Sequence, residues 1–174
     1  MQHARLLAAV VLATLGSTIV ACDDDDLTDI DEEATFTAAL TPDLSVNPLG
    51  SPTGAGSATI ELDDDDFGVV ITISSPLTSR VTGARIHGPA TVTGAAPVVF
   101  DFTPQMSAAI NAGATSGTIL NAEYDLGDMV PSSNGELRVN AQTLVDMLNN
   151  GTAYISVSTS DNPLGELRGQ VVRR

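Results

Sequence analysis

Several residue types are scarce or missing in this chain of 174 residues, and each absence narrows the possible functions. There is no Trp and no Lys, and aromatic residues make up only 3%, so a core must be built mainly from aliphatic side chains. The single cysteine cannot form an internal disulfide. Seven arginines stand against 22 acidic residues, which gives a formal net charge of −15. A chain this acidic repels phosphate backbones, and we therefore predict no nucleic-acid partner.

The residues that are present favour a single β-rich domain. Hydrophobic residues make up 43% of the sequence, enough for a packed core, and the length suits one ordinary domain with short appendages. The 15 glycines and 9 prolines follow no repeat, which excludes a collagen-like structure and favours a fold with many turns.

The start of the chain has the order of a lipoprotein signal peptide. One arginine, Arg5, precedes an apolar run at residues 6–15 that is too short to span a bilayer. Residues 19–22 (IVAC) resemble the lipobox of bacterial lipoproteins, in which the cysteine receives a diacylglycerol and cleavage occurs just before it. We therefore predict a signal peptide over residues 1–21 and lipid attachment at Cys22. The alternatives are an ordinary secretory signal that contains a cysteine, and a catalytic thiol, which we disfavour because no base lies nearby in the sequence.

An acidic segment follows Cys22. Eight of the eleven residues 23–33 are acidic, so this segment repels itself and buries little apolar surface. We expect residues 22–33 to form an extended, disordered tether between the lipid and a folded domain. Calcium binding is the alternative, although the spacing of an EF-hand loop is absent. The expected location is the cell envelope, facing the periplasm or the cell exterior; inner-membrane retention and surface display both stay open.

Alternation of apolar and polar residues predicts short strands within residues 34–174. The candidate strands are residues 35–41, 57–62, 69–73, 81–87, 97–102, 118–126, 153–159 and 166–172. Residues 63–66 (DDDD) are expected to be the solvated tip of a hairpin rather than a cation site. A helix is predicted over residues 140–151, capped by Asn140, and a weaker helical turn over residues 104–113. These elements predict an all-β fold, an immunoglobulin-like antiparallel β-sandwich of about seven or more strands with one short helix.

Strand parity places polar side chains of three candidate strands away from the core. If Ala84 and Ile86 face the core, Arg85 and His87 face the other way. The same rule turns polar residues outward on the last two strands: Ser156, Ser158, Glu166, Arg168 and Gln170. We expect one hydrogen-bonded patch, in which Arg168 pairs with Glu166 or Asp161 and His87 lies near a strand end. The patch is either a small recognition site or a structural network that fixes turns and register, and the glycines and prolines nearby favour the network.

Three stretches, taken in order, resemble the CHRD domain family. They are residues 83–90 (GARIHGPA) followed by 97–100 (PVVF), the predicted helix at 140–151, and residues 154–170 (YISVSTSDNPLGELRGQ). The resemblance covers residues 34–173. CHRD domains occur repeated in chordin and singly in many bacterial secreted proteins. The resemblance implies an immunoglobulin-like β-sandwich and no established enzymatic activity. In chordin the growth-factor contacts are attributed mainly to separate cysteine-rich modules, which this chain lacks.

Motif residues of this family form the candidate binding patch. They are Arg85, His87, Gly88, Pro89, Asn162, Pro163, Gly165, Glu166, Arg168 and Gly169. Family members often carry histidine at the positions of Arg85 and Ser158, and three imidazoles there would resemble a metal site. In this chain His87 alone remains, because His3 leaves with the signal peptide. We therefore predict no metal site and no cofactor.

No catalytic motif stands out in the sequence. Gly-x-Ser-x-Gly, a phosphate-binding loop and the His-Glu-x-x-His helix of zinc proteases are all absent. We expect a lipid-anchored, non-enzymatic module, bound to the membrane through its N-terminal lipid, that binds a protein or glycan partner outside the cytoplasm. The alternative is a hydrolase or metal-dependent enzyme that uses His87 with nearby carboxylates, which would require a deep pocket containing these groups.

Overall fold

The computed structural model describes residues 33–43, 49–50 and 52–174. The signal peptide, Cys22 and all but the last residue of the tether lie outside the described residues, so the predictions made for them stay predictions. The described strands are β1 (Ala34–Pro42), β2 (Ala55–Asp63), β3 (Asp66–Ser75), β4 (Val81–His87), β5 (Val98–Asp101), β6 (Gly117–Asp125), β7 (Tyr154–Thr159), β8 (Leu167–Gln170) and β9 (Val172–Arg173). The helical segments are the 3₁₀ helix η2 (Thr103–Met106) and the α-helices α1 (Ser107–Asn111) and α2 (Ala141–Asn149).

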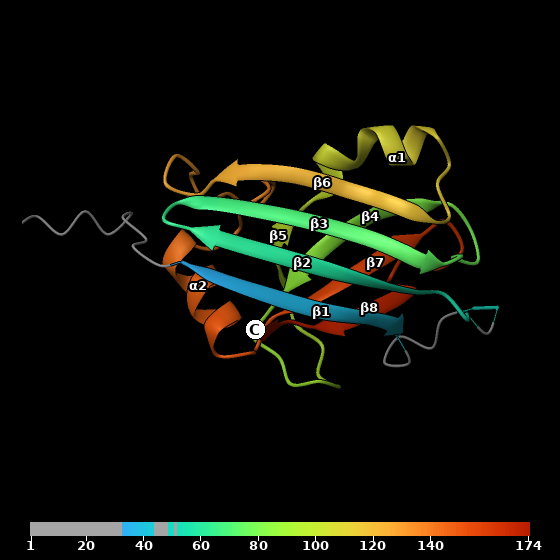
Figure 1. Ribbon diagram of the computed structural model, residues 1–174, viewed down its shortest axis with the longest axis horizontal. Coiled ribbons are helices and arrows are strands. Elements are labelled where there is room, and N and C mark those ends of the chain that lie inside the picture. Colours follow the sequence, from blue (N-terminus) through green and yellow to red (C-terminus); the bar gives the residue numbers. More distant parts are fainter. Residues whose placement is uncertain (1–32, 44–48, 51) are drawn as a thin grey trace, which may run out of the picture.

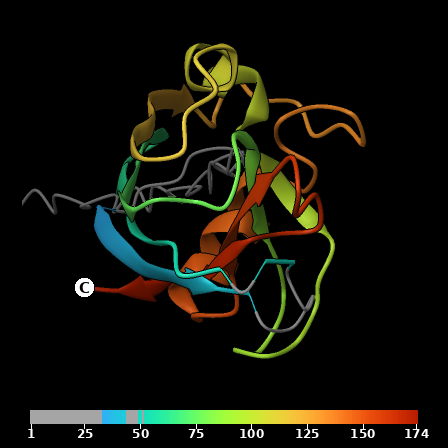
Figure 2. The same cartoon turned by 90° about the vertical axis from the view of Figure 1, so that its right-hand side faces the viewer.

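The strands form one antiparallel sheet in the order β5-β4-β7-β8-β1-β2-β3-β6, with β9 paired to β1. This sheet curls, so that β1, β2, β3 and β6 lie in front of β4, β5, β7 and β8 (Figures 1 and 2). The two halves are joined through a short pairing of β1 with β8, at Thr41 and Pro42. The predicted all-β fold is thus confirmed, in the form of a single curled sheet with two facing halves.

The core lies between the facing halves of the sheet. Aliphatic side chains make up most of it, as the composition predicts. Aromatic rings meet across the gap: Phe67 of β3 and Phe100 of β5 have centroids 5.5 Å apart, and Tyr124 of β6 lies 4.9 Å from Phe100. Helix α2 lies at one end of the sandwich and α1 beside β6 (Figure 1). None of the helices among the described residues is long and apolar enough to cross a membrane.

The local predictions are largely confirmed. The acidic residues 63–66 form the turn between β2 and β3, with Asp63 opposite Asp66. Helix α2 follows Asn140, whose side-chain oxygen accepts a hydrogen bond from the Thr143 N–H at 2.7 Å. Two details differ from the sequence-based expectation. Residues 166–172 are divided between β8 and β9, and the weaker helical turn contains a second α-helix, α1.

The two halves of the sheet differ in how their outer faces are covered. Strand β7 is buried at all six positions, so its outward side chains are covered as well as its inward ones. The outer face of β1, β2, β3 and β6 instead carries exposed or half-buried residues, and neither α-helix lies over it (Figure 1). The predicted polar patch therefore lies beneath another part of the chain.

Candidate functional site

The segment that covers the patch is the connection between β4 and β5. We call residues 88–97 the strap; it is the loop below the sheet in Figure 1. Its two ends are joined to each other, because the Gly88 N–H donates to the Pro97 carbonyl at 3.1 Å. Its backbone is attached to a neighbouring loop where the Ala90 N–H donates to the Thr152 carbonyl at 2.8 Å. Side chains from three neighbouring strands hold the rest of it: His87, Tyr154, Arg168 and Gln170.

His87, at the end of β4, holds the strap through its imidazole. Nδ1 lies 3.0 Å from the Ala96 carbonyl, which can only accept, so Nδ1 carries the proton. Nε2, 3.0 Å from the Ser156 hydroxyl, then accepts a hydrogen bond from it. Burial lowers the pKa of His87, and the charges of Arg85 and Arg168 lower it further, against the opposing effects of the Ala96 hydrogen bond and of Asp43. The imidazole is therefore neutral at neutral pH.

Tyr154 of β7 lies between His87 on β4 and Arg168 on β8. The imidazole stacks on its ring, with centroids 4.8 Å apart and planes within 3°. The Arg168 guanidinium carbon lies 3.4 Å from the centroid of the same ring, a cation–π contact. The Tyr154 hydroxyl accepts from the Ala96 N–H at 3.4 Å. Both backbone groups of Ala96 are thus bound by this stack.

Arg168 and Gln170 of β8 bind carbonyl groups of the strap. One Arg168 nitrogen donates to the carbonyls of Thr91 at 3.0 Å and Gly94 at 2.8 Å. The Gln170 amide donates to Ala90 at 3.3 Å and to Gly151 at 2.7 Å. The predicted pairing of Arg168 with Glu166 or Asp161 is wrong: within the described residues, Arg168 bonds to the strap instead. Parity did place it on the correct face, but its partners lie more than 70 residues away in sequence.

Glu166, which is itself fully buried, forms the centre of a separate polar cluster at the β7–β8 turn. Its carboxylate accepts from the Thr78 N–H at 2.7 Å and the Thr78 hydroxyl at 2.6 Å. It also accepts from the Thr159 hydroxyl at 2.8 Å and the Asn162 amide at 3.2 Å. Asn162 extends this cluster to residues 49–50, because its side-chain oxygen accepts from the Leu49 N–H at 2.6 Å. Two motif positions, Asn162 and Glu166, therefore fix loops around the turn.

The glycines of the motifs stand where a side chain would collide with a neighbouring element. A Cβ on Gly169 would lie 2.5 Å from the Ala39 carbonyl oxygen, where β8 approaches β1. A Cβ on Gly88 would lie 2.7 Å from the sulfur of Met147 on α2. Gly165 has a φ of +134°, and the Gly88–Pro89 peptide bond is cis. Pro163 is exposed in the turn beside Asn162.

Arg85 shares the outward face of β4 with His87 but belongs to a third polar group, formed with the neighbouring strand β5. Asp101 lies opposite it on β5 and is 3.1 Å from the guanidinium Nε. Arg138 approaches the same carboxylate oxygen at 3.1 Å. Burial acts to raise the pKa of Asp101, but hydrogen bonds from Thr103 and the charge of Arg85 outweigh it and lower that pKa. The sequence analysis missed Asp101 and Arg138, because only the pairing of β4, β5 and residues 136–138 brings them to Arg85.

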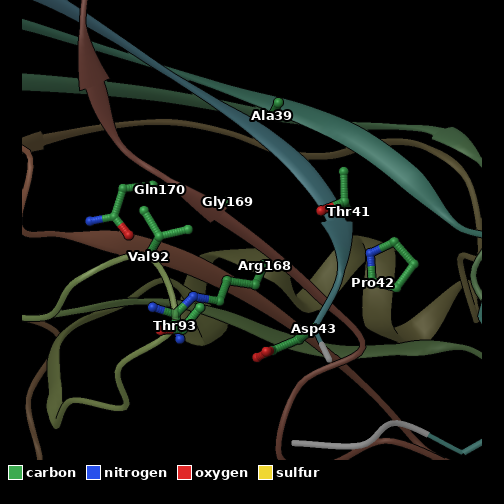
Figure 3. Close-up of a pocket in the computed structure, with 9 residues that line it drawn as sticks. All are labelled: Ala39, Thr41, Pro42, Asp43, Val92, Thr93, Arg168, Gly169 and Gln170. Carbon is green, nitrogen blue, oxygen red and sulfur yellow. The ribbon is translucent and has the colours of Figure 1, made fainter. Parts of the chain in front are cut away.

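A groove of about 570 Å³ opens beside the strap (Figure 3). It is lined by Ala39, Thr41, Pro42, Asp43, Val92, Thr93, Arg168, Gly169 and Gln170. The strap forms one wall through Val92 and Thr93, and the end of β1 forms the other (Figure 3). Val92 is 70% exposed, so it offers an apolar surface at the edge of the groove. Arg168 and Gly169 belong both to the groove lining and to the predicted patch. Asp43 and the strap residues Val92 and Thr93 were not predicted, because no motif in the sequence marks them.

The arrangement around His87 is poorly suited to hydrolysis. His87 does not line the groove, and Ser156, its hydrogen-bond partner, is only 3% exposed. A general base becomes positively charged when it takes a proton, and here that charge would arise near Arg85 and Arg168. Among the described residues, no group of three or more His, Cys, Asp or Glu side chains is placed to hold a metal ion.

Comparison with known proteins agrees with this architecture. The family model of the CHRD domain matches residues 36–171. No curated protein and no solved structure matches the chain. The matched region contains the strap, the residues that hold it and the Glu166 cluster. Because the match spans most of its length, this chain belongs to the CHRD domain family.

Proposed function

We propose that the protein is a lipid-anchored, non-enzymatic domain of the cell envelope that binds a protein or glycan partner in the groove beside the strap. CHRD domains indicate an extracellular binding or structural module. The lipobox and acidic segment at the N-terminus support attachment to a membrane through Cys22, with the domain on the periplasmic or outer side.

The position of the groove relative to the tether carries this proposal. Strand β1 begins at Ala34, directly after the tether, and ends at Pro42 in the wall of the groove. Its nine residues span about 30 Å at roughly 3.3 Å per residue. The groove therefore lies at the end of β1 opposite the end that follows the tether, where we expect a partner to approach without meeting the membrane.

The charge at the opposite end of β1 supports the same orientation. Ala34 is paired with Leu62, so the acidic β2–β3 turn lies beside the start of β1, the strand that follows the tether in sequence. The acidic residues gathered there are Asp63, Asp64, Asp65, Asp66 and Asp125. An anionic membrane surface repels this end and the acidic tether within about a Debye length, roughly 8 Å at physiological salt. The repulsion holds the domain away from the lipid and leaves the groove accessible.

A non-enzymatic role is supported by the chemistry of the buried polar residues. Glu166 and His87 form their hydrogen bonds with other residues of the protein itself. The lining of the groove contains one carboxylate, that of Asp43. The alternative, a hydrolase that uses His87 with neighbouring carboxylates, requires Ser156 or a water molecule beside His87 to become accessible to a substrate.

Capture from native envelope fractions tests the groove as the binding surface. The tagged full chain is compared with Val92→Glu, which places a charge in the groove, and with Val130→Glu, the same substitution at a position that is 84% exposed and not part of the groove lining. We expect partners captured by the wild-type chain and by Val130→Glu to be lost with Val92→Glu. Equal capture by all three chains, or no partner at all, would contradict the proposal.

A further inference from the structure

We propose that the strap is an acid-sensitive wall of the groove: protonation of His87 releases residues 88–97 from the outer faces of β7 and β8 and removes Val92 and Thr93 from the binding surface. The inference rests on the proposed function only in treating the groove as the binding site. The release itself follows from the contacts that hold the strap.

The strap is attached mainly by polar contacts. Of its ten residues only Gly88 is buried, and its aliphatic side chain of greatest size, Val92, is mostly exposed. Its attachment therefore depends on the hydrogen bonds to His87, Tyr154, Arg168 and Gln170, and on the backbone bond from Ala90 to Thr152, rather than on buried apolar area. Segments with few buried apolar contacts open locally at a lower free energy than the strands beneath them. A change at one of the polar contacts can thus open the strap while the sandwich stays folded.

The charged groups around His87 disfavour a second positive charge there. Arg85 lies two residues before it on β4, paired with Asp101 of β5, and Arg168 lies on β8. Asp43, which follows β1, partly offsets them. Tyr154 of β7 contributes a neutral ring, and the strap itself, GPATVTGAAP, carries no charged side chain. Protonated His87 would therefore be a partly buried cation near two guanidinium groups.

The cost on protonation is electrostatic rather than the loss of one hydrogen bond. The Ser156 hydroxyl can rotate and accept from a protonated Nε2, so that contact survives. The buried charge remains unfavourable, and it is relieved when the strap lifts and water reaches the imidazole. The contact of His87 with Ala96 and the contacts of Arg168 with the strap carbonyls are lost together when the strap lifts, because these groups belong to one short segment.

The sign of the pH dependence follows from the lowered pKa of His87 in the closed form. An exposed imidazole has a pKa of about 6.5. The open strap therefore binds a proton more tightly than the closed strap. Closure is fully favoured above about pH 6.5 and is lost as the pH falls through the pKa of His87 in the closed form.

Hydrogen exchange measured by mass spectrometry on the full chain tests this inference. Exchange of strap amides, including those of Ala90 and Ala96, is followed from pH 8 to pH 5 and corrected for the intrinsic pH dependence of exchange. We expect corrected exchange in residues 88–97 to accelerate below about pH 6.5, by at most about tenfold per pH unit, the limit for one proton. Protection in β2 and β3 should not change.

Two variants make the test specific to His87. His87→Gln, which cannot become charged, should show no pH-dependent change in strap protection, whereas Glu123→Gln, on the exposed side of β6, should behave as the wild-type chain. Unchanged protection of the strap, the same acceleration in His87→Gln, or simultaneous loss of protection in all strands would overturn the inference.

If His87→Gln does not fold, NMR titration of the wild-type chain decides the question. The midpoint for the His87 imidazole should coincide with the midpoint for strap exchange, and separate midpoints would overturn the inference. No ligand is needed in either experiment. If the capture experiment finds no partner, the proposed function fails but the hydrogen-exchange result on the strap is unaffected. If strap exchange does not change with pH, the acid-sensitive strap is rejected and the proposed function is unaffected.

Discussion

Most polar side chains of the family motifs bind backbone groups of loops that lie far from them in the sequence. Arg168 donates to the Thr91 carbonyl of the strap. Glu166 accepts from the Thr78 N–H, and Asn162 contacts both the Thr78 hydroxyl and the Leu49 N–H. Such groups are costly to leave without partners, because their hydration was lost on burial. The direct effect of these motif residues is thus to fix loops in place, and they influence the shape of the groove only through those loops.

Replacement of the Glu166 carboxylate should measure this effect. In Glu166→Gln the side chain keeps its shape, but one of its two acceptor oxygens becomes an NH₂ group, which then meets either the Thr78 N–H or the donors of Thr159 and Asn162. We expect a loss of about 1–3 kcal/mol in the free energy of unfolding, since buried donors lose their acceptor. Urea denaturation provides the measurement. The matched control, Glu123→Gln on the exposed side of β6, should change stability by less than about 0.5 kcal/mol. A loss of similar size in both variants would refute the assigned role of Glu166.

At the scale of elements, the close approach of β8 to β1 joins the two halves of the sheet. These strands pair over only two positions, and Gly169 lies directly beside the β1 backbone at Ala39. The absence of a side chain there sets the distance between the strands. The same region is the floor of the groove, so its geometry affects both stability and binding.

Gly169→Ala should disturb this junction. The added Cβ would lie 2.5 Å from the Ala39 oxygen and 3.1 Å from the Ala38 Cβ, so the backbone must shift. Overpacking of this kind costs about 1–3 kcal/mol. The control is Gly68→Ala on β3, where the added Cβ would meet only atoms at 3.8 Å and stability should stay equal or rise slightly. Urea midpoints compare the two variants, and a tolerated Gly169→Ala would show that the strands can separate freely.

At the scale of the whole molecule, the protein has two chemically distinct ends. One end carries the start of β1 and the acidic turns, and the other carries the groove and the strap tip. An N-terminal lipid would fix which end faces the membrane. The orientation, and not the fold alone, would then determine what the groove can meet.

Anchoring is tested by Cys22→Ser. We expect the variant to leave the membrane fraction or to stay unprocessed, and to lose labelling by a fatty-acid probe, because its only thiol has been removed. The control combines Cys22→Ser with Ser57→Cys, which restores a thiol at an exposed site on β2 and should restore neither labelling nor anchoring. Membrane partitioning that is unchanged in Cys22→Ser would contradict lipid attachment.

The sequence by itself determined the strands, the capped helix α2 and membership of the family. These properties are local: alternation with a period of two residues identifies strand faces, and Asn140 and Gly151 mark the ends of a helix within a few residues. Parity even identified which side of β4 carries Arg85 and His87. The break between β8 and β9 was not predicted, since it depends on pairing with β1 and on the Val171 N–H, which donates to the Ala153 carbonyl.

Only the tertiary structure decided what the polar residues do. Thr78 and Glu166 are separated by 88 positions in the chain, and Arg168 and Thr91 by 77. No local pattern specifies such partners, because any of several arginines or carboxylates satisfies the same parity rule. The strap folds over β7 and β8, so the outward polar side chains of these strands are covered and bind the strap. The open groove lies beside the strap, between Val92 and the end of β1.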